Sequence, residues 1–164
     1  MAAAIDLIVA FLRQLGLGVS EGEVSDDAFL PGLRIKAGEI VLDPGKLRWP
    51  GDLLHEAGHL AMTPAAQRGA LSDDLAGQQS DAHAGEAEAT AWAYAATVAL
   101  GLPPEVLFHA GGYRGQSQGL IATYGAGVYP GSRGLCEAGM ALIGEAARAQ
   151  GLPPYPHMLR WLRE

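Results

Sequence analysis

Two histidines and a glutamate within one short apolar run have the types and spacing to hold a metal ion. His55, Glu56 and His59 lie in the sequence LLHEAGHLA, residues 53–61. On a helix, the four-residue spacing puts both imidazoles on one face, one turn apart. Two neutral imidazoles so placed can bind one zinc ion, and the neighbouring carboxylate can act as a general base toward water at the metal. The pattern therefore predicts a metal-binding helix.

The same three residues could instead be a chance grouping on a helix surface, or polar residues of the core without any metal. Only five histidines occur among 164 residues, which argues against chance. An unliganded polar pair would also be costly to bury within an apolar run. We therefore favour metal binding, and the absence of any metal remains the alternative.

The ends of this helix can be predicted from the flanking residues. Pro50 suits the first turn of a helix, and Asp52 is favourable near its positive end. Pro64 disfavours helical backbone in the residue before it. We expect the helix to begin near Pro50 and to end near Thr63.

A catalytic zinc site has a third protein ligand and an open position for water. The extended pattern HExxHxxGxxH cannot supply that ligand, because Met62 and Ala65 stand where it requires glycine and histidine. The better source is residues 86–100, which are rich in alanine, contain no glycine or proline and predict a helix.

One face of that second helix carries a single carboxylate above small side chains: Glu86, Ala89, Thr90, Ala93 and Thr97. Small side chains let helices approach closely, so this face could pack on the first helix and direct Glu86 at the ion. Both Glu86 and Glu88 could instead be an ordinary acidic first turn. Glu88 and His83 remain alternative third ligands.

The combined pattern resembles a known group of metallopeptidases. HExxH is the signature of the zincins, and EAEATAWA at residues 86–93 resembles the second helix of the glutamate-ligand zincins, or gluzincins. Among small soluble members, the resemblance is to the ImmA/IrrE-like metallopeptidases. It covers residues 33–93 and implies a zincin-like fold, Zn²⁺ as the cofactor and Glu86 as the metal ligand. Thr90 departs from related membrane-bound zincins, which have Asp there, and nothing in the resemblance identifies a substrate.

A hydrolytic zinc site also benefits from a donor that stabilises the oxyanion of the transition state. His109, Tyr113 and Tyr129 are the candidates for oxyanion or substrate contacts, each with a purely structural role as its alternative. The glycine-rich stretches around Tyr113 and Tyr129 have the wrong spacing for a nucleotide-binding loop.

The remaining periodicity predicts a mostly helical α+β domain with a small sheet or hairpin beside the metal helix. A β-hairpin is expected over residues 33–43, with Gly38 in its turn. Helices are expected at 3–16, 103–109, 116–124, 135–149 and 155–163, and loops at 16–27 and 63–85.

Length and composition further limit the possible fold and function. The chain is the size of one domain, residues 1–164, and is 49% hydrophobic. A net charge of −7 offers no basic surface for nucleic acid, and no segment is apolar enough to span a membrane. Cys136 is the only cysteine, which fits a reducing compartment, so we expect a cytoplasmic protein.

These features together predict a zinc-dependent hydrolase, most simply a peptidase acting on a peptide or protein. His55, His59 and Glu86 would hold the zinc, and Glu56 would be the catalytic base. The alternative is a non-catalytic zincin-like module that binds metal and acts by binding a protein partner. Oligomeric state is not predicted.

Overall fold

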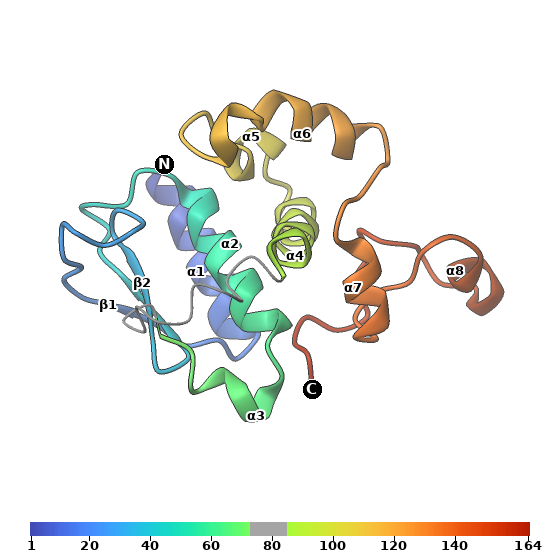
Figure 1. Cartoon of the computed structure of the whole chain (residues 1–164), viewed down its shortest axis with the longest axis horizontal. Coiled ribbons are helices and arrows are strands. Elements are labelled where there is room, and N and C mark those ends of the chain that lie inside the picture. The colour runs from blue at the N-terminus through green and yellow to red at the C-terminus, as the bar shows by residue number, and fades with distance from the viewer. Residues whose placement is uncertain (73–84) are drawn as a thin grey trace.

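A computed structural model describes residues 1–72 and 85–164. Helices account for most of the regular structure, and a small sheet lies at one side of the molecule (Figure 1). The prediction of a mostly helical α+β fold is confirmed. Among the described residues, no helix is both long and apolar enough to cross a membrane.

Both halves of the described chain contain regular elements. The N-terminal half contains α1 (Ala2–Gln14), β1 (Val19–Glu21), β2 (Leu33–Lys36), β3 (Glu39–Leu42), α2 (Pro50–Met62) and α3 (Ala65–Arg68). The C-terminal half contains α4 (Glu86–Ala99), α5 (Pro104–Leu107), a 3₁₀ turn (Tyr113–Gly115), α6 (Ser117–Gly125), α7 (Ser132–Glu137) and α8 (Gly144–Gln150).

The sheet has the strand order β1-β3-β2. Strands β2 and β3 form the predicted antiparallel hairpin, with Ile35 opposite Ile40. Its turn residues, Ala37 and Gly38, both have positive φ (49° and 78°), which matches the twist of a two-residue hairpin. The hairpin prediction is therefore confirmed.

Strand β1 was not expected, because residues 16–27 read as a polar loop. It pairs parallel to β3, with Val19 opposite Ile40. The backbone N–H groups of Ile40 and Gly22 donate to the carbonyls of Gly18 and Leu42 at 2.9 Å. The strand is set by this pairing with β3 rather than by its own three residues, so the loop prediction was wrong there.

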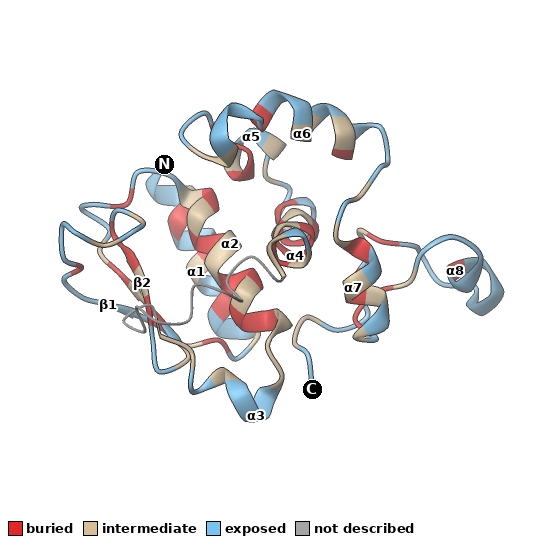
Figure 2. Cartoon of the chain, in the orientation of Figure 1, coloured by how far each residue is buried: buried red, intermediate tan, exposed pale blue. Residues whose placement is uncertain are grey.

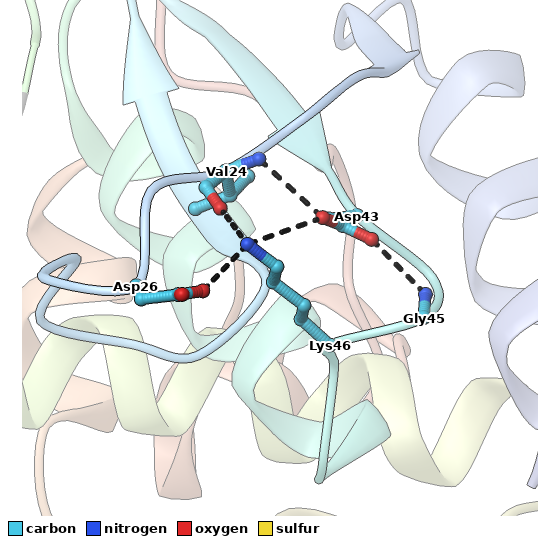
Figure 3. Close-up of polar contacts among 5 residues, drawn as sticks. All are labelled: Val24, Asp26, Asp43, Gly45 and Lys46. Atoms are coloured by element: carbon cyan, nitrogen blue, oxygen red, sulfur yellow. Dashed lines mark hydrogen bonds and ion pairs between the residues drawn. The ribbon is translucent and has the colours of Figure 1, made fainter.

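A polar network fastens the connection between β1 and β2 to the end of β3 (Figure 3). The ammonium group of Lys46 donates to the carbonyl oxygen of Val24 at 2.7 Å and pairs with Asp26 at 2.6 Å. Asp43 lies 4.0 Å from the same ammonium group and accepts a hydrogen bond from the Gly45 N–H at 3.1 Å. One lysine thus ties the acidic loop to the hairpin.

Helices α2 and α4 form the centre of the molecule. In Figure 1, α4 is seen end-on, with α2 on one side, α7 on the other and α5 and α6 above. Buried residues gather on the faces of α2 and α4 that point into this assembly (Figure 2). They include Leu53, Leu54, Leu60, Trp92 and Ala96. Helices α2 and α4 therefore both contribute to the hydrophobic core.

Two glycines let α2 approach its neighbours more closely than any side chain would allow. A Cβ atom at Gly58 would lie 2.5 Å from the carbonyl oxygen of Ala89 in α4. At Gly51, a Cβ would overlap the carbonyl of Val106 in α5. The contact at Gly58 is consistent with the expected packing of the small face of residues 86–97 against the helix that carries His55 and His59.

The prediction of two C-terminal helices, at residues 135–149 and 155–163, was wrong. The first region is broken into α7 and α8, because Gly139, which follows α7, and Gly144, the first residue of α8, adopt positive φ (68° and 53°). Residues 155–163 are not helical. There, the N–H groups of Leu159 and Arg163 donate to the carbonyls of Met140 and Ala61, so contacts with distant residues replace helical hydrogen bonds.

Candidate metal centre

The two histidines of α2 lie side by side on one face of the helix. Their rings are 4.8 Å apart between centroids and nearly perpendicular, at 82°. The Nε2 atoms of His55 and His59 are 3.1 Å apart. The helix begins at Pro50 and ends at Met62, so its predicted limits are confirmed.

Glu86, the first residue of α4, reaches the same point from the other helix. Its Oε2 atom lies 3.2 Å from Nε2 of His55, and its Oε1 atom lies 3.2 Å from Nε2 of His59. The Gly58 contact brings α4 close enough for this short side chain to span the gap. The structure therefore brings together the three residues that the sequence pattern named as candidate ligands.

Of the two alternative third ligands, Glu88 is among the described residues. Glu88 lies against α7, where a Cβ atom at Gly134 would be 2.3 Å from its Cγ atom. His83 lies outside the described residues, as does most of the connection expected over residues 63–85. Of the two glutamates at the start of α4, only Glu86 contacts the histidines in the structure.

While the Glu86 carboxyl is ionised, hydrogen atoms alone cannot satisfy all three contacts. Each histidine needs a proton on Nε2 to donate to the carboxylate, but two such protons would face each other across the 3.1 Å contact between the rings. Removing either proton leaves a nitrogen lone pair facing the carboxylate. A cation between the three atoms would satisfy all of them at once.

Their chemistry and spacing fit zinc in particular. Imidazole nitrogen and carboxylate oxygen are both common zinc ligands, with bonds of about 2.0–2.2 Å. Tetrahedral ligands at that bond length lie about 3.3 Å apart, close to the observed 3.1–3.2 Å. The side chains of His55, His59 and Glu86 are 17%, 25% and 46% exposed, so the centre can be reached from solvent.

The Glu86 carboxyl is held in its charged form. The adjacent rings of His55 and then His59 keep the pKa of this carboxyl well below the usual range, against the opposing effect of burial. A carboxylate that stays ionised is the form that binds a cation. Nδ1 of His55 is buried and has no hydrogen-bond partner among the described residues.

Glu56 follows His55 on α2 and is partly buried. One carboxylate oxygen of Glu56 and one ring nitrogen of each histidine all lie within 4.8 Å of one another. The carboxylate is therefore near enough to the centre to exchange a proton with a water molecule placed beside it.

Tyr113 lies beside the histidines, in contact with the ring of His55. The ring centroids are 6.2 Å apart and the rings are perpendicular, at 88°. Burial raises the pKa of its hydroxyl group, and Asp52 and Glu86 raise it further, so the hydroxyl keeps its proton and remains a donor. Tyr113 and Arg114 both have positive φ (54° and 51°), a strained conformation in residues other than glycine.

In the described part of the chain, the ring of His109 contacts neither histidine of α2. Tyr113 lies between His109 and His55 and contacts both rings. His109 is buried, and its Nε2 atom donates to Oδ1 of Asp52 at 2.8 Å. Its ring stacks on Trp49 with centroids 4.6 Å apart, and it also contacts the ring of Tyr113, with centroids 6.2 Å apart. His109 therefore ties the loop that carries Tyr113 to the first turn of α2.

The third oxyanion candidate, Tyr129, has a different environment. It belongs to a cluster of tyrosines and contacts Tyr94, Tyr124 and Tyr155. No ring contact of Tyr129 with His55 or His59 occurs among the described residues. Of the three candidates, the structure brings only Tyr113 against a candidate ligand.

Sequence reasoning missed the partners that fix α2. Asp52 had been explained by the helix dipole alone, although it stands three residues before His55 and so shares its face. At the other end, the Arg68 guanidinium donates to the carbonyls of Leu60 and Thr63 at 2.8 and 3.1 Å. Arg163 N–H donates to the carbonyl of Ala61. His55 and His59 thus lie on a helix held at both ends.

Comparison with known proteins adds no relative. No protein-family model, no curated protein and no solved structure gives a significant match to this chain.

Proposed function

We propose that this protein is a zinc-dependent peptidase. The observation that carries the proposal is the triangle of Nε2 of His55, Nε2 of His59 and the carboxylate of Glu86, with each pair of atoms 3.1–3.2 Å apart. Hydrogen atoms alone do not satisfy these contacts while the carboxyl is ionised. The sequence resemblance to the gluzincins supports the same assignment. In this proposal, those three residues hold Zn²⁺.

Bound zinc would supply Lewis-acid chemistry, which polarises a carbonyl group and makes water a stronger acid. The carboxylate of Glu56 accepts a proton from the attacking water and passes it to the departing amine nitrogen. The neutral hydroxyl group of Tyr113 is the candidate donor to the carbonyl oxygen as negative charge develops there. His109 and Asp52 act through Tyr113, by positioning its loop.

Removal and return of the metal test this proposal. Incubation with a zinc chelator should abolish hydrolysis of a mixed library of quenched fluorescent peptides, and added ZnCl₂ should restore it. MgCl₂ should not restore it, because magnesium prefers an all-oxygen octahedral site. Hydrolysis that persists after complete removal of zinc would exclude the mechanism.

The non-catalytic alternative has its own outcome in the same experiment. Zinc-loaded protein that binds one metal per chain but cleaves no peptide of the library would favour a binding module. The partial exposure of the candidate ligands supports catalysis, because a purely structural zinc site has four protein ligands and no open position.

A further inference from the structure

A hollow of about 410 Å³ lies between the start of α2 and the segment from α5 to α6. Its lining includes the aromatic and polar side chains of Trp49, Glu105, Phe108, His109 and Gln118. Phe108 and His109 are buried and form fixed parts of its wall, whereas Trp49 is 37% exposed. The hollow is therefore an open surface feature with an aromatic lining.

The hollow adjoins the candidate metal centre. Tyr113 separates them: its ring contacts His109, in the wall of the hollow, and His55, in the metal centre, each at 6.2 Å between centroids. An extended peptide advances about 3.4 Å per residue, so a few residues would bridge the two places. A peptide lying over the metal centre could thus place a side chain in the hollow.

The charge of the lining favours a positively charged side chain. Glu105 is exposed, and the hollow has no lysine or arginine among its described lining residues. Glu105 forms no ion pair within the described part of the chain. The whole protein is acidic, with a net charge of −7, which attracts cationic peptides. An incoming positive charge would thus meet an uncompensated carboxylate.

The aromatic lining favours one type of positively charged side chain over the other. The ring of Trp49 is held by parallel stacking on His109, with centroids 4.6 Å apart and an angle of 8°. A planar guanidinium group can stack on indole while its N–H groups donate to a carboxylate, which an ammonium group does less well. We infer that this hollow binds an arginine side chain of the peptide substrate, an inference that rests on the proposed peptidase function.

Binding can be measured separately from turnover. The probes are blocked alanine-based decapeptides that carry one arginine at each position in turn, and matched peptides with citrulline, the neutral analogue of arginine. Calorimetry with the zinc-loaded Glu56→Gln protein should show arginine peptides binding about fivefold more tightly, the scale of one exposed ion pair. Glu105→Gln should remove that preference, and Trp49→Leu should weaken both sets.

Glu145→Gln is the matched control, because Glu145 is an exposed carboxylate on α8, away from the hollow. It should leave the preference unchanged. Equal binding of arginine and citrulline peptides to the unaltered hollow, or a preference that survives Glu105→Gln, would overturn the inference. If the wild-type protein cleaves the peptides, the scissile bond should lie at a fixed distance from arginine. A preference that depends on Glu105 without any cleavage would support the hollow and reject the peptidase.

Discussion

Replacing Glu56 by glutamine should abolish peptide hydrolysis and leave zinc bound. Glutamine has nearly the same size and helix propensity as glutamate, so α2 should keep its structure. The amide cannot accept the proton that the attacking water must lose. General acid–base catalysis typically contributes a factor of 10² to 10⁴, so kcat/KM should fall by about that factor.

A second carboxylate on the neighbouring helix provides the control. Glu88 lies against Gly134 rather than the histidines, so Glu88→Gln should keep most of the activity. Zinc content is measured on both variants by mass spectrometry of the metal. If the Glu56→Gln protein carries full zinc and still hydrolyses peptides at the wild-type rate, Glu56 is not the catalytic base.

Replacing Gly58 by alanine should destabilise the protein, which is the reverse of the usual effect. In an exposed helix interior, this change stabilises by about 0.5–1 kcal/mol. Here the added Cβ atom would lie 2.5 Å from the carbonyl oxygen of Ala89 and 3.1 Å from its Cα atom. Because those neighbours are backbone atoms, α4 must move, and overpacking of this kind costs about 1–3 kcal/mol.

The same displacement should weaken zinc binding, since Glu86 lies one turn before Ala89 on α4. Urea unfolding in the presence of chelator measures stability alone, and competition with a zinc indicator measures affinity. Gly119→Ala in α6 is the matched control: its Cβ would meet only the Gln116 side chain at 3.9 Å, so that variant should be slightly more stable. A stabilised Gly58→Ala protein with unchanged zinc affinity would contradict the close packing of α2 on α4.

The helices that form the candidate centre could be predicted because local patterns define them. Pro50 and Pro64 bracket α2, and the run of alanines without glycine or proline defines α4. The turn at Ala37 and Gly38 likewise indicates the hairpin. The small side chains on its helix face made Glu86 a candidate, and the resemblance to the gluzincins favoured it over Glu88. Each of these signals lies within a few residues of the feature it predicts.

The features that escaped prediction depend on residues distant in sequence. Strand β1 exists because β3 offers it backbone partners. The segment 155–163 gives up helical hydrogen bonds for contacts with Met140 and Ala61. The bond between Asp52 and His109 joins residues 57 positions apart, and neither residue type alone suggested it. Such pairings become visible only once the chain is folded.

The arrangement around α2 explains why a rigid centre could form at this point. The hydrogen bond from His109 to Asp52 fixes the first turn of α2, and Arg68 fixes its last turn. At the middle of α2, Gly58 lets α4 pack closely because it has no side chain. A metal site needs its donors held to within a fraction of an ångström, and supporting contacts of this kind provide that precision. The two candidate histidine ligands therefore lie on a helix that is held at its first turn, middle and last turn, and Glu86 lies on the helix packed against it.

The central claim is that His55, His59 and Glu86 together bind zinc, and metal content tests it most directly. Wild-type protein and Glu88→Ala, purified without chelator and dialysed against trace zinc, should carry about one zinc per chain. Glu86→Ala, which removes one side of the triangle, should carry almost none. No zinc in the wild-type protein, or full zinc in Glu86→Ala together with its loss from Glu88→Ala, would contradict the claim.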